Sequence, residues 1–349
     1  METKGKRLAT WLMLLAVLLP VTALAGNSSR IGTGGAQELL IPGGARGIAF
    51  GASYMAFATG TDAIFWNPAG LSRMDPSVEV LVSHMEYIAD IGVDYGAVGV
   101  KAGDFGTLGF TVKSITFGDI PITTNLFPDG TGSVYSPTFI TAGITYSKLL
   151  TDRISVGFTT SLVTEKIINV SATGVAFDAA IQYKNLGYQG LNLGIAIKNV
   201  GPQMTFAGPG LLVTANAPNT GRGSQNYSVD AASFDMPSSL EIGLGYQRQF
   251  DEENSAEVGA LFRNNNYQDD EYGFGGEYSF NNMFFVRGGY TFEPQAQDDP
   301  TGARSYPWDY TMGAGVHYDF TGISLTVDYA YRHVKYFTNN NIIALRLGF

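Results

Sequence analysis

Three histidines, His84, His317 and His333, are the side chains best suited to chemistry in this cysteine-free sequence. A histidine can serve as the base for a serine nucleophile, or bind a metal together with carboxylates or thiolates. No G-x-S-x-G motif accompanies them, and they form no closely spaced cluster with carboxylates. We therefore expect no enzymatic activity, no metal site and no cofactor.

Polar and small residues alternate with apolar ones along much of the chain, in segments of about ten residues. In 323–331, Ile, Leu, Val, Tyr and Tyr occupy the odd positions, and polar or small residues the even ones. This period of two indicates a strand with one apolar face. The same pattern in 308–320 places Trp308 on the apolar face and Asp309 on the other.

Fourteen segments of this kind follow one another along the chain, and their even number suits a closed antiparallel sheet. Short turns (102–106, 149–153, 250–254, 280–283, 319–322) lie between longer loops (118–136, 201–237, 294–306). This asymmetry is typical of outer-membrane barrels, so we predict an all-β transmembrane antiparallel barrel over 78–349. The expected strands are 78–89, 92–102, 106–117, 137–149, 152–164, 172–184, 190–200, 238–249, 255–264, 270–280, 283–293, 307–319, 322–333 and 341–349.

In such a barrel the apolar face meets lipid and the charges point into the lumen. Both signs are present there, which favours a solvated or internally paired lumen over a selective ion path. The charged residues expected to face inward are Lys113, Asp178, Lys184, Lys198, Glu241, Glu257, Arg263, Glu271, Glu277, Arg287, Asp309, His317, Asp328, Arg332 and Arg346.

Composition and the N-terminus agree with this location. Charged residues make up 15% of the chain, against about 25% in typical soluble domains, and the net charge of −10 argues against a nucleic-acid partner. Residues 1–25 read as a signal peptide, with a basic start, an apolar run and Ala-Leu-Ala before the expected cleavage site. We expect export to the outer membrane of a Gram-negative bacterium, with its lipid as a partner.

The C-terminus adds a second indication of an outer-membrane barrel. Apolar residues alternate up to a terminal aromatic residue, at Ile343, Leu345, Leu347 and Phe349. A C-terminal aromatic of this kind resembles the signal by which bacterial barrels are recognised for assembly. We therefore predict that the last strand engages the barrel-assembly machinery and pairs with the first strand to leave no open edge.

The long loop 201–237 carries an apolar cluster, namely Met204, Phe206, Leu211, Leu212 and Val213. Exposed apolar residues on a loop indicate a recognition surface or a lid. The same residues could instead fold back over the mouth of the barrel. The sequence leaves both interpretations open.

Residues 26–77 precede the first strand and do not alternate like strands. A barrel of fourteen strands is too wide for its own side chains to fill, and narrower than the open 16-stranded porins. The segment is apolar and rich in small residues, and 45–59 can form one or two helical turns. We predict an N-terminal plug inside the lumen, fastened by the rigid turn that follows Asp62.

The plug carries a motif that resembles the N-terminal signature of the PorV/PorQ family, within the FadL-like superfamily of fourteen-stranded barrels. The matching residues include Gly44, Ala45, Arg46, Gly51, Asp62, Asn67, Pro68, Ala69, Gly70 and Leu71. A stretch more acidic than Thr59-Gly60-Thr61 would be expected before the motif, which leaves the subfamily open.

The resemblance implies two functions. A PorV-like protein is a component of type IX secretion that binds secreted cargo proteins or other secretion components at its extracellular side. A FadL-like protein admits hydrophobic small molecules, such as fatty acids or hydrocarbons, past an N-terminal hatch. We favour the first, keep the transporter as the alternative, and place a purely structural or adhesive barrel third.

Overall fold

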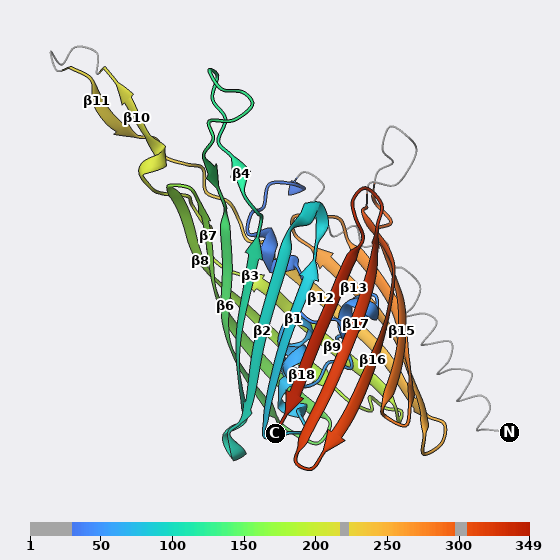
Figure 1. Cartoon of the computed structure of the whole chain (residues 1–349). Coiled ribbons are helices and arrows are strands. Elements are labelled where there is room, and N and C mark those ends of the chain that lie inside the picture. The colour runs from blue at the N-terminus through green and yellow to red at the C-terminus, as the bar shows by residue number, and fades with distance from the viewer. Residues whose placement is uncertain (1–29, 217–222, 297–305) are drawn as a thin grey trace.

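A computed structural model describes residues 30–216, 223–296 and 306–349; the expected signal peptide lies outside these ranges. Its dominant feature is a closed barrel of fourteen antiparallel strands, in which each strand pairs with its neighbours and β1 pairs with β18 (Figure 1). The barrel strands are β1 (Val78–Glu86), β2 (Gly92–Lys101), β3 (Thr107–Thr116), β6 (Thr138–Leu149), β7 (Ile154–Ile167), β8 (Val170–Tyr183), β9 (Leu191–Val200), β12 (Ser239–Gln249), β13 (Asn254–Asn265), β14 (Glu271–Phe280), β15 (Phe284–Phe292), β16 (Trp308–Phe320), β17 (Ile323–Val334) and β18 (Asn340–Gly348).

The barrel confirms the predicted fold and strand number. Apolar side chains point outward, as shown by Val82, Ile144 and Val286, which are 50%, 58% and 64% exposed. Polar side chains point inward and are buried, as are Gln182 and Thr311 at 0% and 4% exposed. This alternation is the one that a barrel surrounded by lipid requires.

The seam between the first and last strands closes at the chain terminus. Phe349 N donates to Val78 O over 2.8 Å, and Ser77 N donates to Phe349 O over 2.8 Å. The side chains of Ile343, Leu345 and Phe349 lie on the outer face, at 61%, 36% and 50% exposure. No strand edge is therefore left open at this seam.

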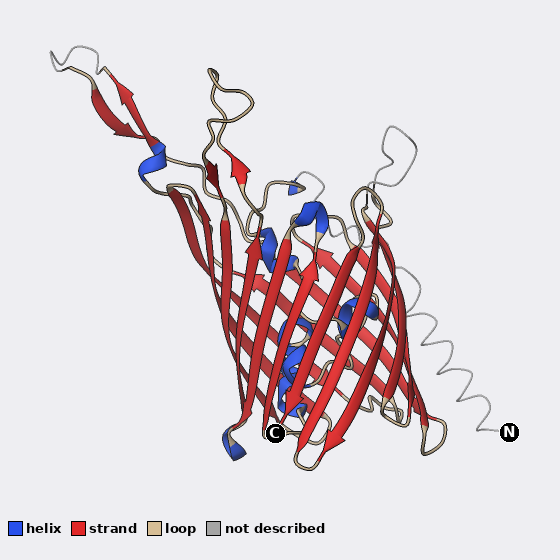
Figure 2. Ribbon diagram, in the orientation of Figure 1, coloured by secondary structure: helices blue, strands red, loops and turns tan. Residues whose placement is uncertain are grey.

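Short helices lie inside the lumen of the barrel (Figure 2). They belong to the N-terminal segment, as predicted for the plug, and each is only a few residues long. In the described parts of the connections between strands lie three further short helices, η5 (Ile88–Asp90), η6 (Gly103–Phe105) and η7 (Pro209–Leu211). The plug helices are η2 (Gln37–Leu40), α2 (Arg46–Ala49), η3 (Gly60–Asp62), α3 (Ala63–Trp66) and η4 (Pro68–Arg73). Among the described residues no helix is long and apolar enough to cross a membrane.

The long loops carry small hairpins that sequence alternation did not predict. β4 (Ile120–Pro121) pairs with β5 (Val134–Tyr135), and β10 (Leu212–Ala215) pairs with β11 (Gln225–Ser228). Both hairpins project from the end of the barrel opposite the C-terminus (Figure 1). Long loops mark the extracellular end of such barrels, so the C-terminal end is the periplasmic one.

A β-bulge corrects one detail of the predicted strand faces. The pairing of β16 with β17 shifts register between Trp308 and Thr311. Trp308 consequently points into the lumen, where the Arg332 guanidinium lies 3.9 Å from its ring centroid. Asp309, which strict alternation places among the lumen-facing charges, instead pairs with His333 of β17, whose Nδ1 lies 2.8 Å from Asp309 Oδ1. An extra residue in one strand reverses the faces of its neighbours, which strict alternation cannot anticipate.

Candidate binding cavity above the plug

The plug is seated on inward-facing glycines of the barrel wall. A Cβ atom on Gly273 would lie 2.5 Å from Gly51 O, and one on Gly313 would lie 2.6 Å from Ala49 Cβ. Real Cβ atoms essentially never come that close to another heavy atom, so the wall must lack side chains here. The same is true of other glycines opposite the plug, namely Gly99, Gly109, Gly157, Gly194, Gly243, Gly245, Gly259, Gly275 and Gly289.

The turn at Asn67 is locked by its own side chain. Asn67 Oδ1 accepts from Ala69 N over 3.1 Å, which caps the short helix η4, and Pro68 occupies its first position. Asn67 Nδ2 donates to Met55 O within the plug and to Ile181 O of the wall, each over 3.2 Å. The residue thus joins two parts of the plug to strand β8.

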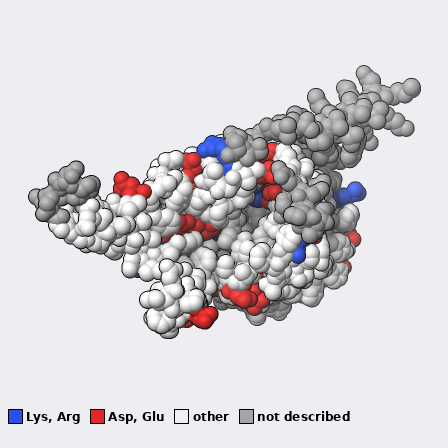
Figure 3. Space-filling model, turned by 90° about the horizontal axis from the view of Figure 1, so that it is seen from above, with Lys and Arg blue, Asp and Glu red and all other residues white. Residues whose placement is uncertain are grey.

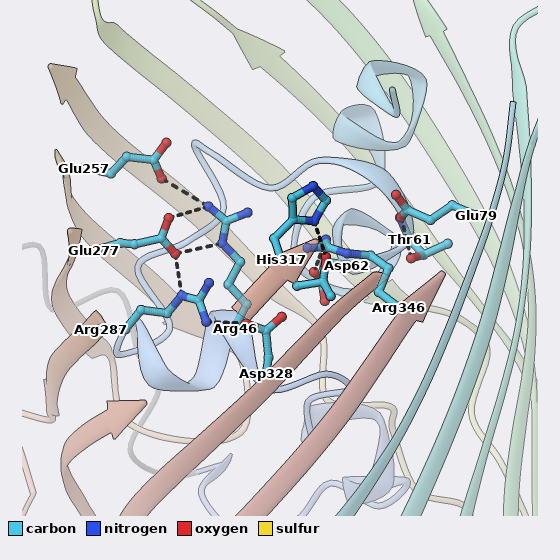
Figure 4. Close-up of polar contacts among 11 residues, drawn as sticks. Arg46, Thr61, Asp62, Glu79, Glu257, Glu277, Arg287, His317, Asp328 and Arg346 are labelled. Atoms are coloured by element: carbon cyan, nitrogen blue, oxygen red, sulfur yellow. Dashed lines mark hydrogen bonds and ion pairs between the residues drawn. The ribbon is translucent and has the colours of Figure 1, made fainter. Parts of the chain in front are cut away.

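A buried ionic network holds α2 against the wall (Figure 4). Arg46 Nη2 lies 2.7 Å from Glu277 Oε1 and 3.6 Å from Glu257 Oε2. Glu277 also pairs with Arg287, which in turn reaches Asp328 Oδ1 at 2.5 Å. Several carboxylates and guanidinium groups therefore compensate one another in the lumen.

Two further contacts fasten the middle of the plug to the first and last strands (Figure 4). Arg346 Nη1 of β18 donates to Asp62 Oδ2 over 2.7 Å. Glu79 Oε1 of β1 accepts from Thr61 N over 2.6 Å and from Thr61 Oγ1 over 2.7 Å. The plug therefore bridges the seam where the barrel closes.

Above the plug lies a cavity of about 490 Å³, which we call the upper cavity. Its wall combines aromatic and aliphatic side chains from the plug, from several strands and from the loops above them. Phe117 and Phe139 form an edge-to-face pair in this wall, with ring centroids 4.8 Å apart. The aromatic and aliphatic side chains of this wall include Phe65, Trp66, Tyr87, Ile115, Phe117, Phe139 and Trp308.

The arginines that line the upper cavity are engaged with their neighbours. Arg263 pairs with Glu241 at 2.8 Å and with Glu271 at 2.7 Å. The Tyr306 hydroxyl donates to Glu271 over 2.9 Å, and Arg332 lies over the Trp308 ring. With both arginines engaged, the wall offers a ligand its aromatic side chains and a few polar groups, among them the carboxyl groups of Glu38 and Glu165.

A small polar chamber of about 60 Å³ adjoins the upper cavity at Phe65. Lys113 Nζ and Lys198 Nζ lie 5.4 Å and 4.9 Å from the centroid of the Phe65 ring. Lys198 also pairs with Glu241 at 3.2 Å, and Lys113 donates to Ile41 O over 2.7 Å. The lumen is therefore internally paired here, as its mixed charges predicted.

A second cavity of about 570 Å³ lies on the other side of α2, towards the periplasmic end. Ile48 lines the upper cavity and Arg46 lines this lower one, although the two residues belong to the same helical turn. His317 and Arg346 also line the lower cavity. The plug thus separates two cavities with a single helical turn between them.

The apolar residues predicted on loop 201–237 fall into two groups. Met204 is 1% exposed and packs with Met236 and the plug residue Leu39, while Phe206 covers the same cluster. Leu211 is half-buried, whereas Leu212 and Val213 are 49% and 50% exposed on the projecting hairpin. The base of the loop therefore folds over the barrel mouth, and strand β10 presents apolar side chains to solvent.

The motif residues Gly44, Ala45, Arg46, Gly51, Asp62 and Asn67 to Leu71 all lie in the plug, but the sequence did not reveal the upper cavity. Phe117 and Phe139 lie close to strand ends, where alternation says least about direction. Trp308 is turned inward by the bulge. The wall glycines that contact the plug, by contrast, could have been found by following the inward face of each predicted strand. Among the described residues, no group of three or more histidine or carboxylate side chains could hold a metal.

Comparison with known proteins identifies the fold. No family model and no curated protein sequence matches the chain. The toluene transporter TbuX of Ralstonia pickettii superposes with a TM-score of 0.56 at 13% identity, covering 88% of this chain and 98% of that one. The toluene transporter TodX of Pseudomonas putida superposes with a TM-score of 0.53 at 16% identity, covering 88% and 97%. The chain therefore has the FadL-like fold of a closed 14-stranded β-barrel, as these two solved structures do.

Proposed function

We propose that this protein is an outer-membrane channel for small hydrophobic molecules, which enter the upper cavity from the extracellular side. The observation that carries the proposal is the aromatic lining of the cavity above a plug. Its volume of about 490 Å³ falls within the usual range of small-molecule sites, roughly 300–1,000 Å³. The shared fold with two toluene transporters supports the same ligand class.

The proposal includes export and location. Residues 1–25 act as a signal peptide, residues 26–77 form the plug, and residues 78–349 form the barrel in the outer membrane of a Gram-negative bacterium. Seen from above, acidic side chains are scattered around the mouth of the barrel (Figure 3). A neutral apolar molecule is not repelled by these charges, which makes it a better candidate than an anionic solute.

An uptake assay tests the proposal. Cells carrying the protein should accumulate toluene faster than cells carrying an empty vector, and Phe117→Ser should reduce this gain several-fold. Removing one aromatic contact weakens binding by about 1 kcal/mol, or roughly fivefold. Phe105→Ser, at a periplasmic turn where Phe105 is 62% exposed, is the matched control and should behave like wild type. Uptake equal to that of the empty vector would contradict the proposal.

A second candidate function, cargo reception in a type IX-like secretion system, draws on the projecting hairpin β10–β11. Its exposed Leu212 and Val213 could contact a protein partner. This is the function that the PorV/PorQ resemblance implies. Co-purification from native membranes separates the two candidates: secreted proteins sharing a C-terminal domain favour reception, and a bound hydrophobic compound without such proteins favours the channel.

A further inference from the structure

Glu38 of the plug is a buried carboxyl group at the wall of the upper cavity. The residue is 3% exposed. Among the described residues, no group donates a hydrogen bond to either of its carboxyl oxygens. A buried carboxyl without donors is costly as an anion, so its environment favours the protonated form.

Glu165 of β7 supplies the only partner that Glu38 has among the described side chains. The two carboxyl groups are within hydrogen-bonding reach of each other, and Glu165 is 5% exposed. The charge of Lys113 of β3 also acts on Glu38, but its ammonium group donates to Ile41 O. Two adjacent buried carboxyls repel each other strongly when both are ionised, and one shared proton joins them.

Burial first, and then the charge of Glu165, raise the pKa of Glu38 to about 8, against a weaker opposing effect of Lys113. The other charged groups near this segment are paired elsewhere: Arg263 with Glu271 across the cavity, and Asp235 with Arg30 at its outer end. At neutral pH, Glu38 therefore stays protonated, and its hydroxyl group donates a hydrogen bond to Glu165.

The carboxyl pair fastens a segment that borders the upper cavity. Residues 35–41 supply Gly35, Glu38 and Ile41 to the cavity wall. Gly35 N donates to Asp235 O over 2.9 Å, and Leu39 packs against Val163. Glu165 also accepts a hydrogen bond from the backbone of Ala36, and Lys113 of β3 donates to Ile41 O over 2.7 Å; the shared proton adds the link between the Glu38 side chain and β7.

We propose that Glu38 and Glu165 form a proton-dependent latch, which holds the segment 35–41 against β7 while the proton is shared and releases it when the proton leaves. Release moves the segment off the wall and widens the mouth of the upper cavity. The inference goes beyond the transport proposal, because it holds whatever the cavity carries.

The sign of the pH dependence follows from the raised pKa. The docked segment binds a proton more tightly than the released one, so docking is strongest at acidic pH. Docking weakens as pH rises from about 4.5, the ordinary value for a glutamate, to about 8, and changes little above that. Mobility of the segment should therefore increase across this range and then level off.

A single spin label on η2 measures this directly. The chain has no cysteine, so Gln37→Cys, at an exposed position next to Glu38, takes one label in the full-length protein in nanodiscs. We expect label mobility to rise between pH 5 and pH 8. In Glu38→Gln and in Glu165→Gln, an amide donates to the remaining carboxyl group, so the label should stay immobile up to pH 9.

Glu252→Gln, in the periplasmic turn after β12, is the matched control and should leave the wild-type transition unchanged. Gel mobility with and without heating verifies that each variant is a folded barrel. A wild-type label with no pH response, or the same response in Glu38→Gln as in wild type, would overturn the latch. Because the readout is mobility, failure of the latch remains distinguishable from failure of toluene uptake.

Discussion

Arg346 of the last barrel strand donates to Asp62 of the plug over 2.7 Å, with only 3% of the Asp62 side chain exposed. This pair joins the final strand to the segment that precedes the first strand. It therefore stabilises the plug and the barrel seam together.

The Asp62–Arg346 pair gives the first prediction. Asp62→Leu and Arg346→Met should each lower the free energy of unfolding by about 3–5 kcal/mol, because each leaves a buried charge without its partner. The double variant removes both charges and should cost clearly less than the sum of the two. Urea unfolding followed by tryptophan fluorescence measures this; strictly additive costs would show that the two residues are not coupled.

The inward-facing wall glycines that contact the plug give the second prediction. Gly289→Ala places a Cβ against the backbone of Gly51, so the plug must shift, at a cost of about 1–3 kcal/mol. Limited proteolysis should cut the plug of this variant faster than that of wild type. Gly288→Ala is the neighbouring control, since its Cβ meets nothing closer than Thr311 O at 3.9 Å. Equal plug cleavage in wild type and both variants would argue against a tightly seated plug.

The C-terminal residue gives the third prediction. The Phe349 side chain lies on the outer face at 50% exposure, so it contributes little to the packed interior. Phe349→Ser should therefore lower the amount of barrel assembled in cells several-fold while leaving refolding in detergent nearly unchanged. Phe320→Ser, another outward aromatic at 56% exposure, is the control. Equal assembly of both variants would rule out a role for Phe349 as the assembly signal.

The barrel was predictable because its sequence pattern has one physical cause. Lipid outside and a polar lumen inside impose a period of two on every strand, so a strand over 323–331 can be predicted from the sequence alone. The strand β7 runs to Ile167, three residues beyond the expected 164, because its pairing with β8 continues up to Ile167 and Val170.

The candidate site was predictable only in part. A plug could be expected from the width of the barrel, but its contacts depend on long-range pairs such as Asp62 with Arg346, which no local pattern reveals. The bulge at Trp308 changes one wall of the upper cavity through a register shift in the sheet. The pairing of Glu38 with Glu165 likewise depends on where the plug docks.

Contact quenching of tryptophan fluorescence is the most direct test of the central claim that the upper cavity binds small apolar molecules. With residues 1–25 removed, Trp66 and Trp308 are the only tryptophans left, and both line this cavity. Bromobenzene, an apolar aromatic quencher, should quench their emission saturably, with weaker binding in Phe117→Ser than in Phe105→Ser. Quenching that only rises linearly, as expected from partitioning into the surrounding lipid, and that is equal in both variants would contradict the claim.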